Sequence, residues 1–383
     1  MLRTRNASEQ LEIEQLQRRI EALRVHGGAA SPGGSSVPAA GQAAAGQAPA
    51  EQEAPGTQAS GRIKKPPRES SVSDIYQQQN ALFAHGLTIT PGFSYVYSDN
   101  RFFTLNGFLA LGAVLLGSVN VSRQQSSVVG LNVNATYGLT PRLQLDLNLP
   151  FIMRNTTYVG AGANFSTAQV SQATTNDAQF GDVGGGFYYQ LVREHDQVPT
   201  VVVNAHVTAP TGLSPYGIKL VLNPSNTNLT YPALLPTGQG VWQISGGATF
   251  IKTEDPAVLF AGVNYYHNFA RHFADISPSQ ETVTPGQAAP GDSFSANLGT
   301  AFALNERVST SFSFQDILTS ATRIKPHGQG WQTIAGSSLN AATFNIGLTY
   351  ARSRYSSWVV QLGLGMTQDA PSVQFGVQFP HRF

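Results

Sequence analysis

Two histidines are the residues that come nearest to the parts of a hydrolytic site. Hydrolysis needs a nucleophile or an activated water, a base, and a group that orients the base. His206 alternates with Asn204 and Thr208, which predicts a place on the polar face of a strand. His267 follows a Tyr-Tyr pair where a strand is expected to meet a loop, so an interfacial position among aromatic side chains is the simpler interpretation. The sequence therefore predicts no catalytic residue and no enzyme.

Phosphate and metal chemistry are also poorly supported. The run from Gly181 to Gly186 (GDVGGG) superficially resembles a phosphate-binding loop, but it lacks the lysine and the following helix of that motif. Glycines that ease a tightly curved strand explain it better. Cysteine is absent, which excludes disulfide frameworks and thiolate zinc sites. We expect neither a cofactor nor a metal.

The charged residues are few and unevenly placed. Only 12% of the 383 residues are charged, about half of the ~25% usual in soluble domains. Residues 1–24 hold nine charged side chains, and the 297 residues from position 87 onward hold 28. A net charge of +1 without a basic face argues against nucleic-acid binding. The stretch from 87 onward is too poor in charge for its surface to face only water.

That long stretch alternates between apolar and polar residues with a period of two. Segment 142–151 places leucines at every second position and Gln144, Asp146 and Asn148 between them. Soluble sandwiches expose Lys, Glu and Thr on the outer face, whereas the polar positions here are Asn, Gln, Ser, Thr and Gly. Strands with one apolar face and one polar face predict an antiparallel transmembrane β-barrel over residues 87–383. The polar face would line its lumen, which we expect to include Asp146, Asn148, Asn204 and His206.

The connections between the segments support a barrel in an outer membrane. Short charged turns are expected near 142, 193–196, 252–255, 306–307 and 352–354, and long loops near 156–178, 211–239, 271–291 and 319–339. Short turns on the periplasmic side and long outer loops are the outer-membrane pattern. Aromatic residues near strand ends predict interfacial girdles: Tyr188, Tyr189, Trp242, Tyr265, Tyr266, Tyr350 and Trp358. The chain ends on Phe383 in phase with its last strand.

Thirteen segments qualify as strands: 87–98, 102–120, 128–138, 142–154, 180–192, 199–209, 240–252, 257–269, 292–304, 308–318, 341–352, 357–367 and 372–383. Bacterial barrels have even strand numbers. We predict twelve strands, with 102–120 as the first, and 87–98 as either surplus or a bulged continuation of it. Such a barrel is wide enough for a pore, and an unplugged pore would leak.

The N-terminal region predicts a helix and a tether. Ile13, Leu16, Ile20 and Leu23 form an a/d seam, which favours a short coiled coil over residues 1–25, although a lone amphipathic helix remains an alternative. Residues 26–70 are rich in Ala, Gly, Gln and Pro and predict a disordered linker. Met1 to Arg5 leads into a polar helix, so no secretory signal is predicted, and an exported form would have lost its signal.

A second helix is expected over 71–84, inside a segment that we bound at 71–86. Ser71 and Asp74 resemble a capping box. Six side chains follow helical spacing along one stripe: Val72, Ile75, Tyr76, Gln79, Leu82 and Phe83. The stripe by itself predicts only a helix that packs on a domain.

The order of these parts resembles the outer-membrane secretion channels of Fap functional-amyloid systems. The resemblance rests on IYQQQNALF (75–83), NGFLAL (106–111) and YGLTPRLQLDLNLPF (137–151). The last motif is also similar to wider barrel families, such as transporters linked to phenol degradation. The resemblance implies a trimeric, gated channel that exports amyloid subunits with other Fap components, closed from the periplasmic side by the 71–86 helix. Ile at position a and Leu at position d favour a dimer instead, so dimer and trimer both stay open.

Two other functions remain possible on the sequence alone. An uptake channel for small hydrophobic or aromatic compounds requires a defined apolar pocket in the barrel. An outer-membrane hydrolase requires His206 or His267 beside a serine and a carboxylate or amide. Asp146 is the notable charge within a strand, and we expect it either in the lumen, where it contacts the plug or favours cations, or at the periplasmic edge.

Overall fold

The computed structural model describes residues 70–81, 83, 85–101, 105–110, 113–119, 123–160, 171–223 and 226–383. The predicted coiled coil and all but the last residue of the predicted linker lie outside the described residues. Among the described residues, no helix has the length and apolar character needed to cross a membrane.

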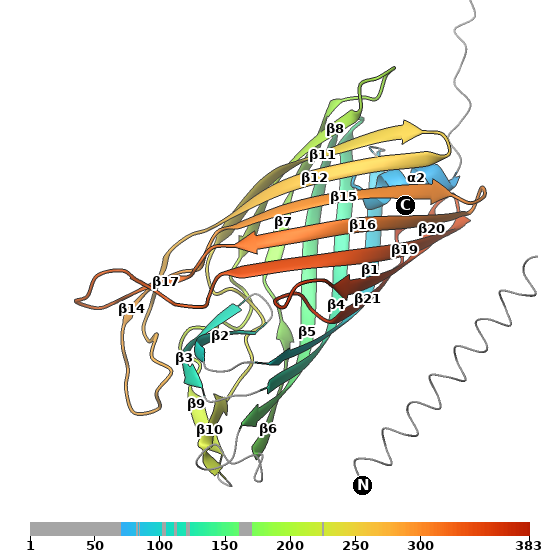
Figure 1. Ribbon diagram of the computed structural model, residues 1–383. Coiled ribbons are helices and arrows are strands. Elements are labelled where there is room, and N and C mark those ends of the chain that lie inside the picture. The colour runs from blue at the N-terminus through green and yellow to red at the C-terminus, as the bar shows by residue number, and fades with distance from the viewer. Residues whose placement is uncertain are drawn as a thin grey trace, which may run out of the picture. The chain divides into compact units, whose positions relative to one another are not determined.

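Twelve antiparallel strands form one closed ring, which confirms the predicted barrel (Figure 1). The ring closes because β19 pairs with both β16 and β20. In order around the barrel, the strands are β1 (Gly86–Arg101), β4 (Arg123–Thr140), β5 (Leu143–Gly160), β7 (Val183–Val192), β8 (Thr200–Ala209), β11 (Gln243–Glu254), β12 (Ala257–Asn268), β15 (Ser293–Ala303), β16 (Val308–Thr319), β19 (Leu339–Ser353), β20 (Ser356–Gly365) and β21 (Val373–Gln378).

The first strand of the barrel is β1, so the prediction that 87–98 is surplus was wrong. β1 pairs with β4 from Gly86 opposite Gly138 to Arg101 opposite Arg123, and its other edge pairs with β21 and with β22 (His381–Arg382). The predicted first strand, 102–120, instead contains β2 (Leu105–Ala110) and β3 (Ala113–Val119), which pair with each other in a separate sheet. Residues 107–117 of this segment are an unbroken run of apolar residues and glycine, and a run of that kind carries no period-two signal to place it in a barrel wall.

The two ends of the barrel differ. At one end, here called the turn end, short charged turns join β4 to β5, β7 to β8, β11 to β12, β15 to β16 and β19 to β20. At the other end, the loop end, long connections carry short strands of their own (Figure 1). These are β9 (Leu220–Asn223) with β10 (Asn226–Pro232), and a sheet of β13 (Arg271–Phe273), β14 (Gly286–Ala289), β17 (Arg323–Pro326) and β18 (Gln332–Thr333).

One predicted loop was partly wrong. Within 156–178, β5 runs on to Gly160, and β6 (Ser171–Phe180) pairs with the outer half of β5. The Ser, Thr and Asn residues in this segment resemble a loop in composition, but they continue a ladder with regular side-chain alternation.

The barrel is apolar outside and polar inside. Leu145, Leu147 and Leu149 on β5 point outward and are 42%, 44% and 43% exposed. Exposed leucines in a row on a strand have the arrangement that lipid requires and water disfavours. Of the predicted girdle aromatics, Tyr189, Trp242, Tyr265, Tyr350 and Trp358 are exposed on the outer surface. Tyr188 and Tyr266 instead face the lumen. Neighbouring residues of a strand point to opposite faces, so one tyrosine of each Tyr-Tyr pair points outward and the other inward.

Candidate functional site

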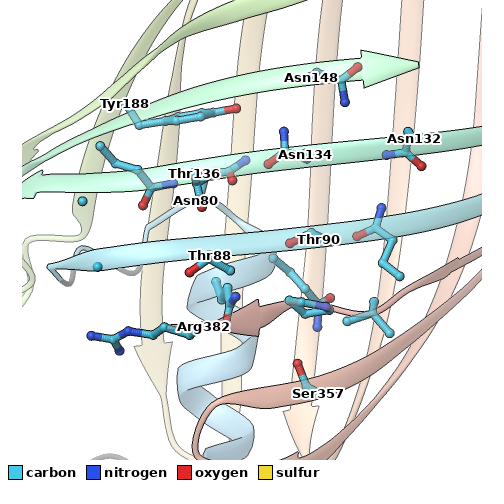
Figure 2. Close-up of a pocket in the computed structure, with 18 residues that line it drawn as sticks. Asn80, Thr88, Thr90, Asn132, Asn134, Thr136, Asn148, Tyr188, Ser357 and Arg382 are labelled. Carbon is cyan, nitrogen blue, oxygen red and sulfur yellow. The ribbon is translucent and has the colours of Figure 1, made fainter. Parts of the chain in front are cut away.

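The candidate site is the lumen at the turn end, where a helix lies among the strands. The helix is α2 (Ser70–Gln78), and Figure 1 shows it within the ring of strands close to the C-terminus. A cavity of about 290 Å³ remains between this helix and the inner wall formed by β1, β4, β5, β20 and β21. Figure 2 shows the polar side chains that converge on it, including Thr88, Thr90, Asn132, Asn134 and Asn148.

The helix ends at a well-formed Schellman motif. Asn80 adopts a left-handed conformation with φ of 51°. The Ala81 N–H donates to the Tyr76 carbonyl at 2.8 Å, and the Asn80 N–H donates to the Gln77 carbonyl at 3.0 Å. Asparagine tolerates this conformation better than most residues, so the sequence stops the helix here and turns the chain toward β1. The helix therefore ends earlier than the predicted 84.

Two consecutive side chains anchor α2 to the barrel wall. Ile75 and Tyr76 are 3% and 1% exposed. They pack in one cluster with five inward-facing apolar residues, here called the wall patch: Val202 of β8, Ile251 of β11, Val258 and Phe260 of β12, and Ala301 of β15. Complete burial of such a side chain contributes about 1.5–3 kcal/mol. The apolar stripe of the helix thus meets a matching apolar area of a mostly polar lumen.

The Tyr76 hydroxyl is also held by hydrogen bonds. It donates to Glu194 Oε2 at 2.6 Å and lies 2.8 Å from Thr253 Oγ1. The other oxygen of Glu194 accepts from the Thr253 N–H at 2.9 Å, and Lys252 Nζ lies 3.9 Å away. Glu194 comes from the β7–β8 turn, so a charge that the sequence assigned to a turn reaches inward to the helix.

The opposite side of α2 is polar. Gln77, Gln78 and Asn80 line the cavity, and the Gln78 side chain donates to Thr349 Oγ1 on β19. The helix is therefore seated against one wall of the lumen, and its amide side chains face the space that remains.

The other predicted plug residues divide into two groups. Phe83 packs against the wall-patch cluster, and Gln79 is partly buried. Leu82 and the side chain of Val72 lie outside the described residues.

The predicted lumen residues Asp146 and His206 lie together on the inner surface. His206 Nε2 is 2.9 Å from Asp146 Oδ1, which is an ion-pair distance. The geometry of this contact is not that of a hydrogen bond, and among the described residues Asp146 Oδ1 accepts none. The Tyr188 ring meets the His206 ring edge-on at 4.9 Å. Gly186 stands opposite both on β7, and a Cβ there would lie 2.5 Å from His206 Cδ2. Asn148 borders the same cavity, and Asn204 pairs with Tyr188 across the strands.

Among the residues that the structure describes, neither histidine has the partners of a hydrolytic site. Ser245 is the strand partner of His206, but within the described part of the chain the two side chains share no hydrogen bond. His267 lies on the outer surface, where its Nδ1 is 3.1 Å from Asp292 Oδ2. Among the described residues, no three His, Asp or Glu side chains gather in a way that would hold a metal ion.

A second cavity, of about 400 Å³, lies at the loop end of the lumen. Strands from around the barrel line it, and its lining mixes amides and hydroxyls with apolar groups. These include Gln124, Gln243, Tyr266, Ile317, Leu339 and Pro371.

The loops around that end are joined by a partly buried group of interactions centred on Lys219 and Asp275, here called the clip. Lys219 donates to the Asp275 carboxylate and to the carbonyls of Ser277 and Thr282, at 3.1 and 3.0 Å for the carbonyls. Burial alone would raise the pKa of Asp275, but hydrogen bonds from Lys219 and from the backbone N–H groups of Thr284 and Ser277 outweigh it and lower the pKa below its usual range. The clip therefore joins loop 210–242 to loop 269–292.

Two residues of this site were missed by sequence reasoning. Glu194 and Thr253 are adjacent to turns, and their composition resembles that of solvated turn residues. Only the pairing of β8 with β11 brings them together beneath the helix. Glu194 and Thr253 lie 59 residues apart, and no local pattern in the sequence links a glutamate in one turn to a threonine at the end of a later strand.

Comparison with known proteins shows the fold. No protein-family model matches the sequence. An outer-membrane channel from Pseudomonas putida F1 is similar over 78% of this chain and 96% of its own length, with 15% identity and a TM-score of 0.50. The toluene transporter TodX of Pseudomonas putida matches with 10% identity over 78% of this chain and 90% of its own, at a TM-score of 0.38. The translocator domain of the autotransporter NalP from Neisseria meningitidis matches with 6% identity over 82% and 97%, at 0.41. The chain thus shares its fold with the outer-membrane channel of Pseudomonas putida F1.

Proposed function

We propose that this protein is an outer-membrane channel, closed at its periplasmic turn end by α2, that exports amyloid fibre subunits of the Fap type. The observation that carries the proposal is the seating of α2 inside the lumen, with Ile75 and Tyr76 buried on the wall patch and Tyr76 bonded to Glu194. A helix that only packed beneath the rim would not bury consecutive side chains against inward-facing residues of four strands. Departure of the helix is the two-state change that opens the channel.

The lumen suits a polypeptide as cargo. Amides and hydroxyls such as Asn132, Asn134 and Thr136 offer donors and acceptors to the backbone of an extended chain. The resemblance of segment 71–151 to Fap secretion channels supplies the class of cargo. In this proposal the heptad helix lies in the periplasm and joins the barrels into a homo-oligomer. The resemblance implies a trimer, and the residues of the seam favour a dimer.

An uptake channel for small hydrophobic or aromatic compounds is the second candidate. The observation that favours it is the cavity at the loop end, where Ile317, Leu339 and Pro371 contribute apolar lining. A small molecule entering from outside would meet this cavity first.

Deletion of the gene in its host separates the two functions. Export predicts the loss of extracellular amyloid fibres, with subunits retained in the periplasm, and restoration by the intact chain. Uptake predicts slower entry of an aromatic compound such as toluene, with fibres still assembled. Fibres that assemble normally in the deletion strain would contradict the export proposal.

A further inference from the structure

We propose that the wall patch and Glu194 together form a binding site for a second polypeptide, one that presents an aliphatic residue followed by tyrosine, and that this segment and α2 compete for the site. The inference rests on the proposed function, because the site becomes available only when α2 leaves the lumen. It adds a substrate-recognition site inside the channel to the gate described above.

The docked helix shows what the site accepts. Ile75 packs in a cluster with the apolar side chains of the wall patch, and Tyr76 belongs to the same cluster with its hydroxyl 2.6 Å from a carboxylate oxygen of Glu194. The two side chains are adjacent in sequence and both are almost fully buried. The site therefore offers apolar side chains to an aliphatic residue and a carboxylate to a phenol.

The aromatic ring of Phe260 lies against the barrel wall because its neighbour on the next strand is a glycine. Phe260 lies across Gly299 of the neighbouring strand, and a Cβ at Gly299 would come within 2.4 Å of the Phe260 ring. Because Gly299 has no side chain, the Phe260 ring can lie close to the backbone of β15. When α2 departs, the apolar groups of the patch lose their cover and Glu194 loses the phenol, so another segment with the same chemistry regains both interactions.

The short connection between α2 and the barrel explains why α2 normally fills the site. Only residues 79–85 separate the helix from β1. A short connection between two interacting parts of one chain gives an effective concentration on the order of millimolar. A free segment with the same two residues is therefore outcompeted, and a translocating chain displaces α2 only when it presents such segments repeatedly or makes further contacts along the lumen.

The test uses the full chain with the helix undocked and a labelled synthetic peptide that copies residues 70–83. The double variant Ile75→Asp/Tyr76→Ala removes both anchors of α2, and fluorescence anisotropy measures peptide binding to the detergent-solubilised protein. We expect the peptide to bind at least tenfold more tightly to the double variant than to the wild type. A peptide with the same two substitutions is the matched ligand control and is expected not to bind.

Two further changes in the double-variant background locate the site. Ile251→Ser alters the wall patch and is expected to weaken peptide binding at least tenfold. Phe250→Leu changes the neighbouring residue of β11, which is 42% exposed on the outer face of the barrel, and as the matched control it is expected to leave binding unchanged. If Ile251→Ser fails to fold, Glu194→Gln is the replacement, with preferential loss of binding for the tyrosine peptide over its phenylalanine counterpart.

The outcomes separate this inference from the proposed function. If the double variant conducts ions more than the wild type but does not bind the peptide, or binds it equally well with Ile251→Ser, the shared site is wrong and the gate stands. If the peptide binds as expected but conductance does not rise, the site stands and the gate is wrong.

Discussion

Tyr76 combines the two kinds of contact that hold the helix in the barrel. Its ring is buried with the wall patch, and its hydroxyl is bonded to Glu194 and lies within hydrogen-bond distance of Thr253. The helical stripe predicted that this side chain would be buried, but the stripe contained no information about its partners. Those partners are Glu194 in the β7–β8 turn and Thr253 near the end of β11, both more than a hundred residues away in sequence, and only strand pairing brings them together.

The substitution Tyr76→Phe tests the hydroxyl alone. It keeps the buried ring and removes the hydrogen bond to a carboxylate, which contributes about 1.5–3 kcal/mol. We expect the frequency of channel openings to rise about 10–100-fold, since every 1.4 kcal/mol is a factor of ten. Gln77→Ala, on the cavity side of the same helix, is the control and is expected to open as rarely as the wild type. An unchanged frequency in Tyr76→Phe would show that the Glu194 bond does not hold the gate.

The packing of β7 against β8 requires a residue without a side chain at position 186. A Cβ there would lie 2.3 Å from the Ala205 carbonyl oxygen and 2.5 Å from the His206 ring. Overpacking of this kind costs about 1–3 kcal/mol, so Gly186→Ala is expected to lower the urea midpoint of barrel unfolding. Gly246→Ala is the matched control, because the nearest atom to its Cβ would be the Asn204 carbonyl oxygen at an ordinary 3.6 Å. Equal midpoints for the two variants would contradict the assignment.

At the scale of elements, the sequence predicted strands better than it predicted connections. Period-two segments such as 142–151 became strands because each one needs an apolar face toward lipid and a polar face inside. The same rule misplaced the start of the barrel, since residues 107–117 are an unbroken run of apolar residues and glycine and 87–98 alternates less cleanly around Pro91 and Gly92. It also missed β6, whose Ser, Thr and Asn residues continue a ladder without the outer apolar face.

The clip between Lys219 and Asp275 gives an element-scale prediction about pH. The pKa of Asp275 is depressed in the folded protein, so its contribution to stability is complete above the unfolded pKa of about 3.9 and is lost as pH falls through the lower folded value. Hydrogen exchange in residues 271–289, corrected for intrinsic rates, is expected to be the same at pH 7 and pH 5. Asp275→Asn is expected to speed that exchange at pH 7. Loosening of the wild-type loop already between pH 7 and pH 5 would contradict this account.

At the scale of the whole molecule, the twelve-strand count was correct although one strand was assigned to the wrong segment. The number of strands followed from the even strand counts of bacterial barrels and from the alternation of short turns with long loops. Neither observation depends on which segment comes first. The asymmetry of the barrel follows from the same pattern. Short turns at one end leave room for a helix to enter from that side, and long loops at the other end are joined by the Lys219 clip.

Oligomerisation through the N-terminal heptads remains a prediction. Its residues, Ile13, Leu16, Ile20 and Leu23, lie outside the part of the chain that the structure describes. The variant Leu16→Glu/Ile20→Glu places charge in the seam, so we expect native mass spectrometry to show monomers where the wild type shows dimers or trimers. The barrel of the variant should remain heat-modifiable in gels, which is the control for folding. An oligomer of unchanged size would rule out the heptads as its cause.

The central claim is that α2 closes the lumen, and planar-bilayer conductance of the full chain tests it most directly. The wild type should show low conductance with rare openings, because Ile75 and Tyr76 hold the helix on the wall patch. The full-length Ile75→Asp/Tyr76→Ala variant should show large and sustained conductance, with Gln77→Ala behaving as the wild type. Equal, large and steady conductance in the wild type and the double variant would contradict the claim.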